Sequence, residues 1–130
     1  MAIRLKFTST DGSPEWLTII TAYAPTFSST RSSKDEFFNS LQNVVSKIPL
    51  DEKYILLGDF NARVGSGQRD DDWCRIRGPH GVGAVNSSGE ELLSFLALHE
   101  GWLCNTWFCK KSSLLGTWQH PRSKRVPCID

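Results

Sequence analysis

Apolar and polar positions near the N-terminus follow the short period of β-strands. Apolar and basic residues alternate from Ile3 to Phe7, which predicts a half-buried strand. Turn-forming residues occupy positions 10–14, and the apolar run from Trp16 to Tyr23 predicts a second, more buried strand. Together the two segments indicate an antiparallel hairpin. It is expected to end at Ala24-Pro25, because proline cannot donate a hydrogen bond to a strand ladder.

The next segment follows the longer period of a helix. Ser33-Lys34-Asp35-Glu36 has the pattern of a capping box, and the helix behind it is expected to end at Pro49. Its apolar residues recur at helical spacing: Phe37, Phe38, Leu41, Val44, Val45 and Ile48. The short apolar run from Tyr54 to Leu57, which ends in Gly58, predicts a buried strand.

The order strand, helix, strand predicts how the two longer strands are arranged. A helix that connects two strands of one sheet usually makes them parallel, through a right-handed crossover. Tyr23 and Asp59 would then lie at the C-terminal ends of their strands, on the same edge of the sheet. That edge is where open α/β sheets place their chemistry.

The second half of the chain has a weaker pattern. Residues 62–86 are rich in Gly, Arg and Asp without periodicity, as in loops that are functional or disordered. A second capping box at Ser88-Gly89-Glu90-Glu91 predicts a helix that stops near Gly101. Further strands are expected at Leu103–Phe108, Gly116–Gln119 and Val126–Ile129. With no repeat and no linker, residues 1–130 are predicted to form a single domain.

Composition and charge exclude several classes of protein. Apolar residues make up 39% of the 130 positions, so disorder along the whole chain is not expected. The net charge of +1 gives no overall field toward nucleic acid or acidic membranes. Most of the cysteines lie beside apolar or aromatic residues, as reduced and buried thiols do, and no zinc-like spacing occurs. Without a signal-like N-terminus or a membrane-spanning segment, a nuclear or cytoplasmic protein is predicted, neither secreted nor membrane-bound.

One tract departs from this even charge. Between Gly101 and Ile129 there is no acidic residue, and the basic residues there are Lys110, Lys111, Arg122, Lys124 and Arg125. Such a tract can meet phosphates. Charge alone favours an ordinary solvated loop.

Asp59 and Asn61 are the strongest candidates in the sequence for a role in binding or catalysis. On an extended backbone, residues two apart point to one face, so a carboxylate and a carboxamide would converge. The carboxylate can hold Mg²⁺ or take a proton from an attacking water, and the amide can donate to a phosphate oxygen. A simple turn after a strand explains the four residues from Gly58 to Asn61 equally well.

Tyr23 and Asp130 are weaker candidates when each is taken alone. The Tyr23 phenol can hydrogen-bond a phosphate, but a tyrosine ending a buried strand more often packs in the core. Asp130 can orient a histidine through its ring N–H, or can be an exposed terminal residue.

Several motifs in a fixed order add a resemblance. Tyr23-Ala24-Pro25, Gly58-Asp59-Phe60-Asn61, Thr117-Trp118 and Ile129-Asp130 resemble the endonuclease/exonuclease/phosphatase superfamily. The sequences of residues 56–65, 105–108 and 117–124 most resemble those of endonuclease domains of LINE-type retrotransposons. They also resemble craniofacial-development-protein-like sequences derived from such elements. The likeness runs from about Leu17 to Asp130.

The resemblance implies a fold and a reaction. The fold would be part of a DNase I-like β-sandwich of two sheets flanked by helices, of the α+β or α/β class. The reaction would be hydrolysis of phosphodiesters in DNA, dependent on Mg²⁺ or Mn²⁺, by in-line attack of an activated water.

The resemblance also implies roles for residues. Asp59 would bind the metal and position the water, Asn61 would bind the phosphate, and Tyr23 would contact a phosphate oxygen. Asp130 would orient the catalytic histidine. The substrate-facing loop would contain Thr117, Trp118 and Arg122.

Two of the family's catalytic groups have no counterpart in the sequence. The metal-binding glutamate precedes the Tyr-Ala-Pro strand, where this chain has only Glu15 in a turn, and the histidine follows the Ile-Asp strand. The resemblance therefore implies a domain truncated at both ends, with little turnover alone. Unpaired strand edges and an apolar sheet face would make it marginally stable and prone to self-association.

Three functional hypotheses follow. The first is a fragment of a metal-dependent endonuclease domain with little or no turnover alone, which another chain or further sequence would complete. The second is a non-catalytic remnant of a retroelement with weak nucleic-acid binding through the basic tract. The third, a phosphatase of the same superfamily, ranks lower because Thr117-Trp118 and its neighbours resemble the retrotransposon branch.

Overall fold

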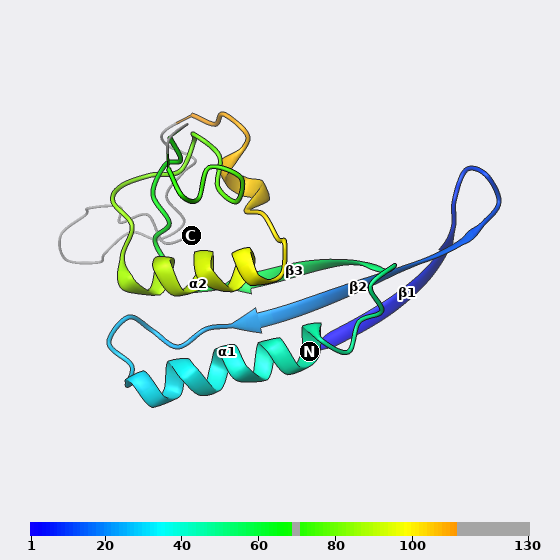
Figure 1. Ribbon diagram of the computed structural model, residues 1–130, viewed down its shortest axis with the longest axis horizontal. Helices are drawn as coiled ribbons and strands as arrows, with labels where there is room; N and C mark the ends of the chain where they lie inside the picture. Colours follow the sequence, from blue (N-terminus) through cyan, green and yellow to red (C-terminus); the bar gives the residue numbers. More distant parts are fainter. Residues whose placement is uncertain (69–70, 112–130) are drawn as a thin grey trace. The chain divides into compact units, whose positions relative to one another are not determined.

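The chain begins with a long antiparallel hairpin (Figure 1). The computed structural model describes residues 1–68 and 71–111. In it β1 (Ala2–Thr8) pairs with β2 (Pro14–Tyr23), with Ile3 opposite Ile19. The reversal is held by the Ser9 N–H, which donates to the Ser13 carbonyl at 2.8 Å, and by Asp11, which accepts from the Ser13 N–H at 2.9 Å. The predicted hairpin is confirmed.

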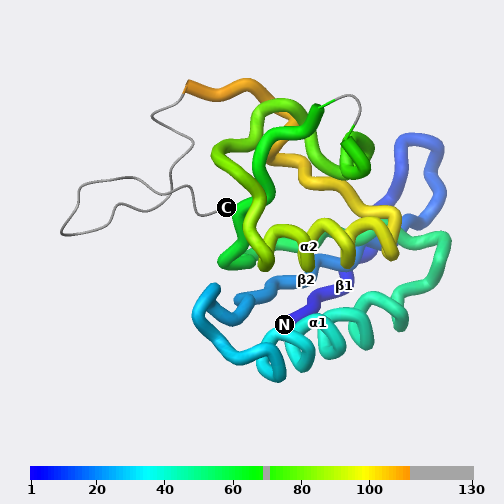
Figure 2. The backbone as a smooth tube through the Cα atoms, turned by 60° about the vertical axis from the view of Figure 1, so that its left-hand side comes forward, coloured from blue at the N-terminus to red at the C-terminus, as the bar shows by residue number. Residues whose placement is uncertain are grey.

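The third strand is parallel to the second, as predicted. Helix α1 (Arg31–Val45) connects β2 to β3 (Lys53–Asp59), and the sheet order is β1-β2-β3. Ile19 of β2 pairs with Ile55 of β3. Figure 2 shows α1 running beside the sheet. Most buried residues of this part lie in β2 and α1, including Ile20, Leu41 and Val45, so α1 supplies the apolar cover of one sheet face.

The other face of the sheet carries exposed apolar side chains. By strand alternation and register, Ile3, Leu5, Ile55 and Leu57 share this face, and each is about half exposed. In the described part of the chain β1 and β3 are the outer strands. The expected apolar face is therefore present, whereas self-association through strand edges stays a prediction.

Helix α1 begins earlier and ends earlier than its pattern predicts. The N-cap is Thr30, whose hydroxyl accepts from the Ser33 N–H at 3.3 Å, so the predicted capping box starting at Ser33 is wrong. The helix ends at Val45, and turns then carry the chain to Pro49. Thr30 takes the capping role because its backbone is extended, with ψ of 155°, while Ser33 already lies within the helix.

The second compact unit begins at Asn61 and contains helix α2 (Ser87–Leu98). Asn86 caps this helix by accepting from the Gly89 N–H at 2.8 Å, so the predicted cap at Ser88 is also wrong. At the other end Glu100 adopts a left-handed φ of 52°, and the Gly101 N–H donates to the Leu96 carbonyl at 2.8 Å. This is a Schellman ending in which Glu100, and not Gly101, takes the left-handed position.

A buried arginine organises the irregular segment before α2. Arg77 is only 8% exposed, and its guanidinium donates to the Val64 carbonyl and pairs with Asp71. Its backbone forms a parallel bridge with Leu103. The described parts of residues 62–86 are thus fixed by charge and hydrogen bonds, which explains why they show no hydrophobic periodicity.

Residues 103–108 do not form the predicted strand. Cys104–Thr106 is instead a 3₁₀ helix, η1. The buried Thr106 hydroxyl donates to the Leu103 carbonyl at 2.8 Å and accepts from the Gly78 N–H at 2.7 Å. A Cβ on Gly78 would lie 2.4 Å from the Thr106 carbonyl oxygen, so this approach requires glycine. The tertiary contact overrides the local alternation of apolar and polar residues.

Several other predictions have mixed outcomes. Cys74, Cys104 and Cys109 are free thiols, but Cys104 and Cys109 are exposed and not buried as expected. None of the helices in residues 1–68 and 71–111 is long and apolar enough to cross a membrane. The strands predicted at 116–119 and 126–129 lie outside the described residues.

The described residues form a mixed α+β fold with one sheet and two helices. A second sheet, and so the predicted sandwich, stays a proposal. The chain separates into two compact units, Met1–Phe60 and the part from Asn61 onward. A single domain over residues 1–130 stays a prediction.

Asp71 gives a pH prediction for stability. Hydrogen bonds from the Trp73 N–H and then from Arg77 lower the pKa of Asp71 below its ordinary value of 3.8. A lowered folded-state pKa stabilises the protein above pH 3.8, and this contribution is lost as the pH falls through the folded-state pKa. We expect Asp71→Asn to lower the free energy of unfolding at neutral pH by about 1.5–3 kcal/mol. The variant should also lose less stability on acidification.

Urea unfolding between neutral and acidic pH measures both effects. Asp72→Asn, at the exposed neighbouring position, is the matched control and should follow the wild-type profile. Parallel pH profiles for wild type and Asp71→Asn would contradict this role of Asp71.

Candidate site at the ends of two parallel strands

Tyr23 and Asp59 are paired across the parallel strands. Both are the last residues of their strands, and they are register partners. The Ala24 N–H donates to the Asp59 carbonyl at 2.8 Å, which extends the ladder one residue past Tyr23. Neighbouring strands lie about 4.8 Å apart, so the phenol and the carboxylate start from adjacent backbone positions. The prediction that both lie at one sheet edge is confirmed.

The exposure of Tyr23 decides between its two interpretations. Its side chain is 72% exposed, although the residue ends a strand whose interior is partly buried. The core-packing interpretation, which the sequence favoured for Tyr23 alone, is therefore wrong. Asp59 beside it is partly buried. The edge thus presents an accessible phenol next to a carboxylate.

Gly58 is required by the close approach of the two strands. Its φ is +147°, a conformation that side-chain-bearing residues rarely adopt. A Cβ at this position would lie 1.8 Å from the carbonyl oxygen of Ala22, its register partner. Gly58 is thus a residue of β3 and not a turn after it. It sets the strand geometry immediately before Asp59.

Phe60, which follows Asp59 in the sequence, packs against α1. Its ring meets the Phe37 ring of α1 edge to face, with centroids 6.3 Å apart, and Phe37 meets Phe38 at 5.2 Å. Such aromatic pairs contribute about 0.5–1.5 kcal/mol beyond burial. Asp59 is therefore fixed between a glycine packed on β2 and an aromatic ring packed on α1.

Asn61 does not extend the strand. β3 ends at Asp59, and Asn61 has a left-handed φ of 45°, which asparagine tolerates better than most residues. Strand alternation therefore does not bring the Asp59 and Asn61 side chains to one face, and that part of the sequence prediction is wrong. A phosphate-binding role for Asn61 stays a prediction.

The residues after Asn61 are held by Asn86, which sequence reasoning missed. The Asn86 side chain accepts from the Arg63 N–H at 3.1 Å, and the Asn86 N–H donates to the Arg63 carbonyl at 2.9 Å. Ala62 and Val64 on either side are buried. An asparagine directly before the Ser-Ser-Gly-Glu-Glu start of a helix is the available signal, because asparagine is a favoured N-cap.

The described residues do not by themselves make a metal centre. In residues 1–68 and 71–111 there is no group of three or more His, Cys, Asp and Glu side chains that could hold a metal ion. Protein sites for Mg²⁺ usually use one or two carboxylates completed by waters and phosphates. Asp59 supplies one such carboxylate. Glu15 bonds instead to Lys53 at 3.1 Å, at the start of β3 and not at its end.

The remaining predicted site residues lie outside the described residues. They are Thr117, Trp118, Arg122 and Asp130. Their roles in substrate binding and in orienting a histidine stay predictions.

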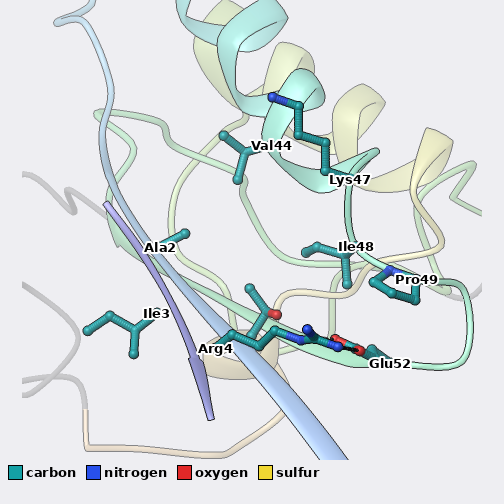
Figure 3. Close-up of a pocket in the computed structure, with 9 residues that line it drawn as sticks. Ala2, Ile3, Arg4, Val44, Lys47, Ile48, Pro49 and Glu52 are labelled. Atoms are coloured by element: carbon teal, nitrogen blue, oxygen red, sulfur yellow. Dashed lines mark hydrogen bonds and ion pairs between the residues drawn. The ribbon is translucent and has the colours of Figure 1, made fainter.

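A separate pocket is lined by other residues, none of them at this edge (Figure 3). It has a volume of about 340 Å³ and is lined by residues of β1, of the end of α1 and of the turns that follow it, and by Thr18 of β2. Arg4 and Glu52 form an ion pair on its wall, which raises the pKa of Arg4. The Arg4 cation is thus already paired, Lys47 is a second cation on the wall, and the other lining residues are mainly apolar. It carries no catalytic constellation.

Comparison with known proteins identifies homologues. The chain is similar to craniofacial development protein 2 of Bos taurus, with 32% identity over 119 residues that cover 92% of this chain and 19% of that protein. It is similar to craniofacial development protein 2 of Tragulus javanicus, with 32% identity over 128 residues, 98% of this chain and 21% of that protein. The chain thus spans about a fifth of the length of these relatives. No protein-family model and no solved structure matches it.

The close approach at Gly58 predicts a strong effect of substitution. Gly58→Ala would place a methyl group against the Ala22 carbonyl in a strained backbone conformation. We expect it to lower the free energy of unfolding by at least about 2 kcal/mol.

Gly12→Ala is the matched control for backbone strain alone. Gly12 also has a positive φ, of 87°, but nothing lies within 4 Å of a Cβ there, so a loss of only about 1 kcal/mol is expected. Urea unfolding measures both variants. Equal losses of unfolding free energy in the two variants would contradict this prediction, because β2 and β3 would then move apart at position 58 at little cost.

Proposed function

We propose that this chain is part of a domain that hydrolyses phosphodiester bonds in nucleic acid, with its phosphate site at the shared end of β2 and β3. The observation that supports this best is the register pairing of Tyr23 with Asp59. The proposal rests on the geometry of this edge and on the motifs around it.

The two side chains offer complementary chemistry. The Asp59 carboxylate can accept a proton from a water that attacks phosphorus, a contribution typically of about 10²–10⁴ in rate. The exposed Tyr23 phenol can donate a hydrogen bond to a phosphate oxygen on which charge develops. Asp59 is also the residue that would contribute to a Mg²⁺ or Mn²⁺ site, where the ion would neutralise phosphate charge.

The proposed activity is weak for this chain alone. The described residues place one carboxylate at the edge and no cluster that holds a metal by itself. We therefore infer an endonuclease-type site with slow turnover. The alternatives are a non-catalytic protein that only binds nucleic acid and, ranked lower, a phosphatase.

Relaxation of supercoiled plasmid tests the proposal. With Mg²⁺, excess protein and long incubation, we expect slow nicking that stops with a chelator. Asp59→Asn keeps the shape of the side chain and removes its basicity, so nicking should fall by about tenfold or more.

Asp51→Asn is the matched control, because Asp51 is an exposed aspartate that precedes β3, whereas Asp59 ends it. It should nick like the wild type. Equal nicking by Asp59→Asn, or none by the wild type, would overturn the catalytic proposal. Hydrolysis of a phosphate monoester without nicking would identify a phosphatase instead.

A further inference from the structure

Exposed aromatic residues are concentrated in one short segment of the second unit. Within its described residues, every large hydrophobic side chain that is well exposed lies between positions 98 and 108. Trp102 is 59% and Phe108 58% exposed, and Trp107 is also exposed. The Trp102 and Trp107 rings meet edge to face, with centroids 6.4 Å apart. We call residues 102–108, which include Trp102, Trp107 and Phe108, the aromatic segment.

The backbone of the aromatic segment is firmly anchored. The Leu103 N–H donates to the Ile76 carbonyl at 2.7 Å, and the Thr106 carbonyl accepts from the His80 N–H at 3.0 Å. Thr106 is buried between the exposed aromatic residues. The rings are therefore exposed on an ordered scaffold, which lowers the entropy lost when a ligand binds.

The charge that follows the segment indicates the ligand. Lys110 and Lys111 are exposed, and the sequence from Gly101 to Ile129 contains no acidic residue. Tryptophan is also common in protein interfaces, but lysine is depleted there. Aromatic faces beside cations match single-stranded nucleic acid, whose bases stack on rings and whose phosphates meet lysines. A duplex keeps its bases stacked on one another and offers no free face.

We propose that Trp102, Trp107 and Phe108, together with Lys110 and Lys111, bind single-stranded nucleic acid. The Tyr23–Asp59 edge contributes none of these residues. It does not depend on hydrolysis, so it would serve a catalytic or a non-catalytic chain.

Fluorescence anisotropy of a labelled oligothymidylate, in chelator and without divalent metal, tests this proposal separately from catalysis. Trp102→Leu keeps an apolar side chain but removes the stacking face, and should weaken binding roughly 5- to 100-fold. Trp102→Phe should retain most of the affinity. The matched control is Phe7→Ala, which removes an exposed aromatic of β1 and should leave binding unchanged.

The lysines are tested through the dependence of affinity on salt. A double variant, Lys110→Gln with Lys111→Gln, should reduce the slope of log affinity against log salt by about 1.4. Circular dichroism and thermal unfolding of each variant show whether the fold is kept.

Three outcomes would overturn the proposal. They are no binding by the wild type, equal affinity of folded Trp102→Leu, or tighter binding of a duplex of the same length. Concentration-dependent self-association that Trp102→Leu abolishes, without oligonucleotide binding, would assign the aromatic segment to contact between copies of the chain.

Discussion

The close backbone approach of β2 and β3 at Gly58 determines the geometry of the candidate site. The Ala22 carbonyl occupies the space that any side chain at position 58 would need. Because the strands stay close there, the ladder continues to the Ala24 N–H and the Asp59 carbonyl. Tyr23 and Asp59 then end their strands side by side. A wider separation would leave the same two residues in the sequence without a shared edge.

The elements that the sequence predicts well are those whose signal is local and repeated. The hairpin follows from alternation, α1 from apolar spacing, and the parallel pairing of β2 with β3 from the rule for crossovers. The predicted helix caps are wrong because several Ser, Thr and Asn residues near each helix start are suitable N-caps. The residue that caps each helix is the one with an extended backbone, Thr30 or Asn86. The order of Ser, Thr and Asn residues in the sequence does not reveal which backbone is extended.

The site was predictable only where topology fixes it. The shared edge of Tyr23 and Asp59 follows from the order of elements, whereas the exposure of Tyr23 depends on what packs around it. The left-handed conformation of Asn61 and the contact of Gly58 with Ala22 involve backbone geometry that residue types do not specify. Similarly, the alternation at 103–108 could not reveal that Thr106 bonds to Gly78, a contact between residues far apart in the sequence.

Binding and hydrolysis have different physical requirements, and the two proposals assign them to different residues of this chain. A single carboxylate would give the strand edge only weak affinity for a metal ion and, through it, for a phosphate. Stacking on exposed rings does not need a metal and tolerates any base. Because both groups belong to one covalent chain, nucleic acid bound by the aromatic segment would have a raised effective concentration at a phosphate site of that chain wherever both can be engaged at once. Weak chemistry at the Tyr23–Asp59 edge is therefore compatible with a role on nucleic acid, provided that the aromatic segment supplies the affinity.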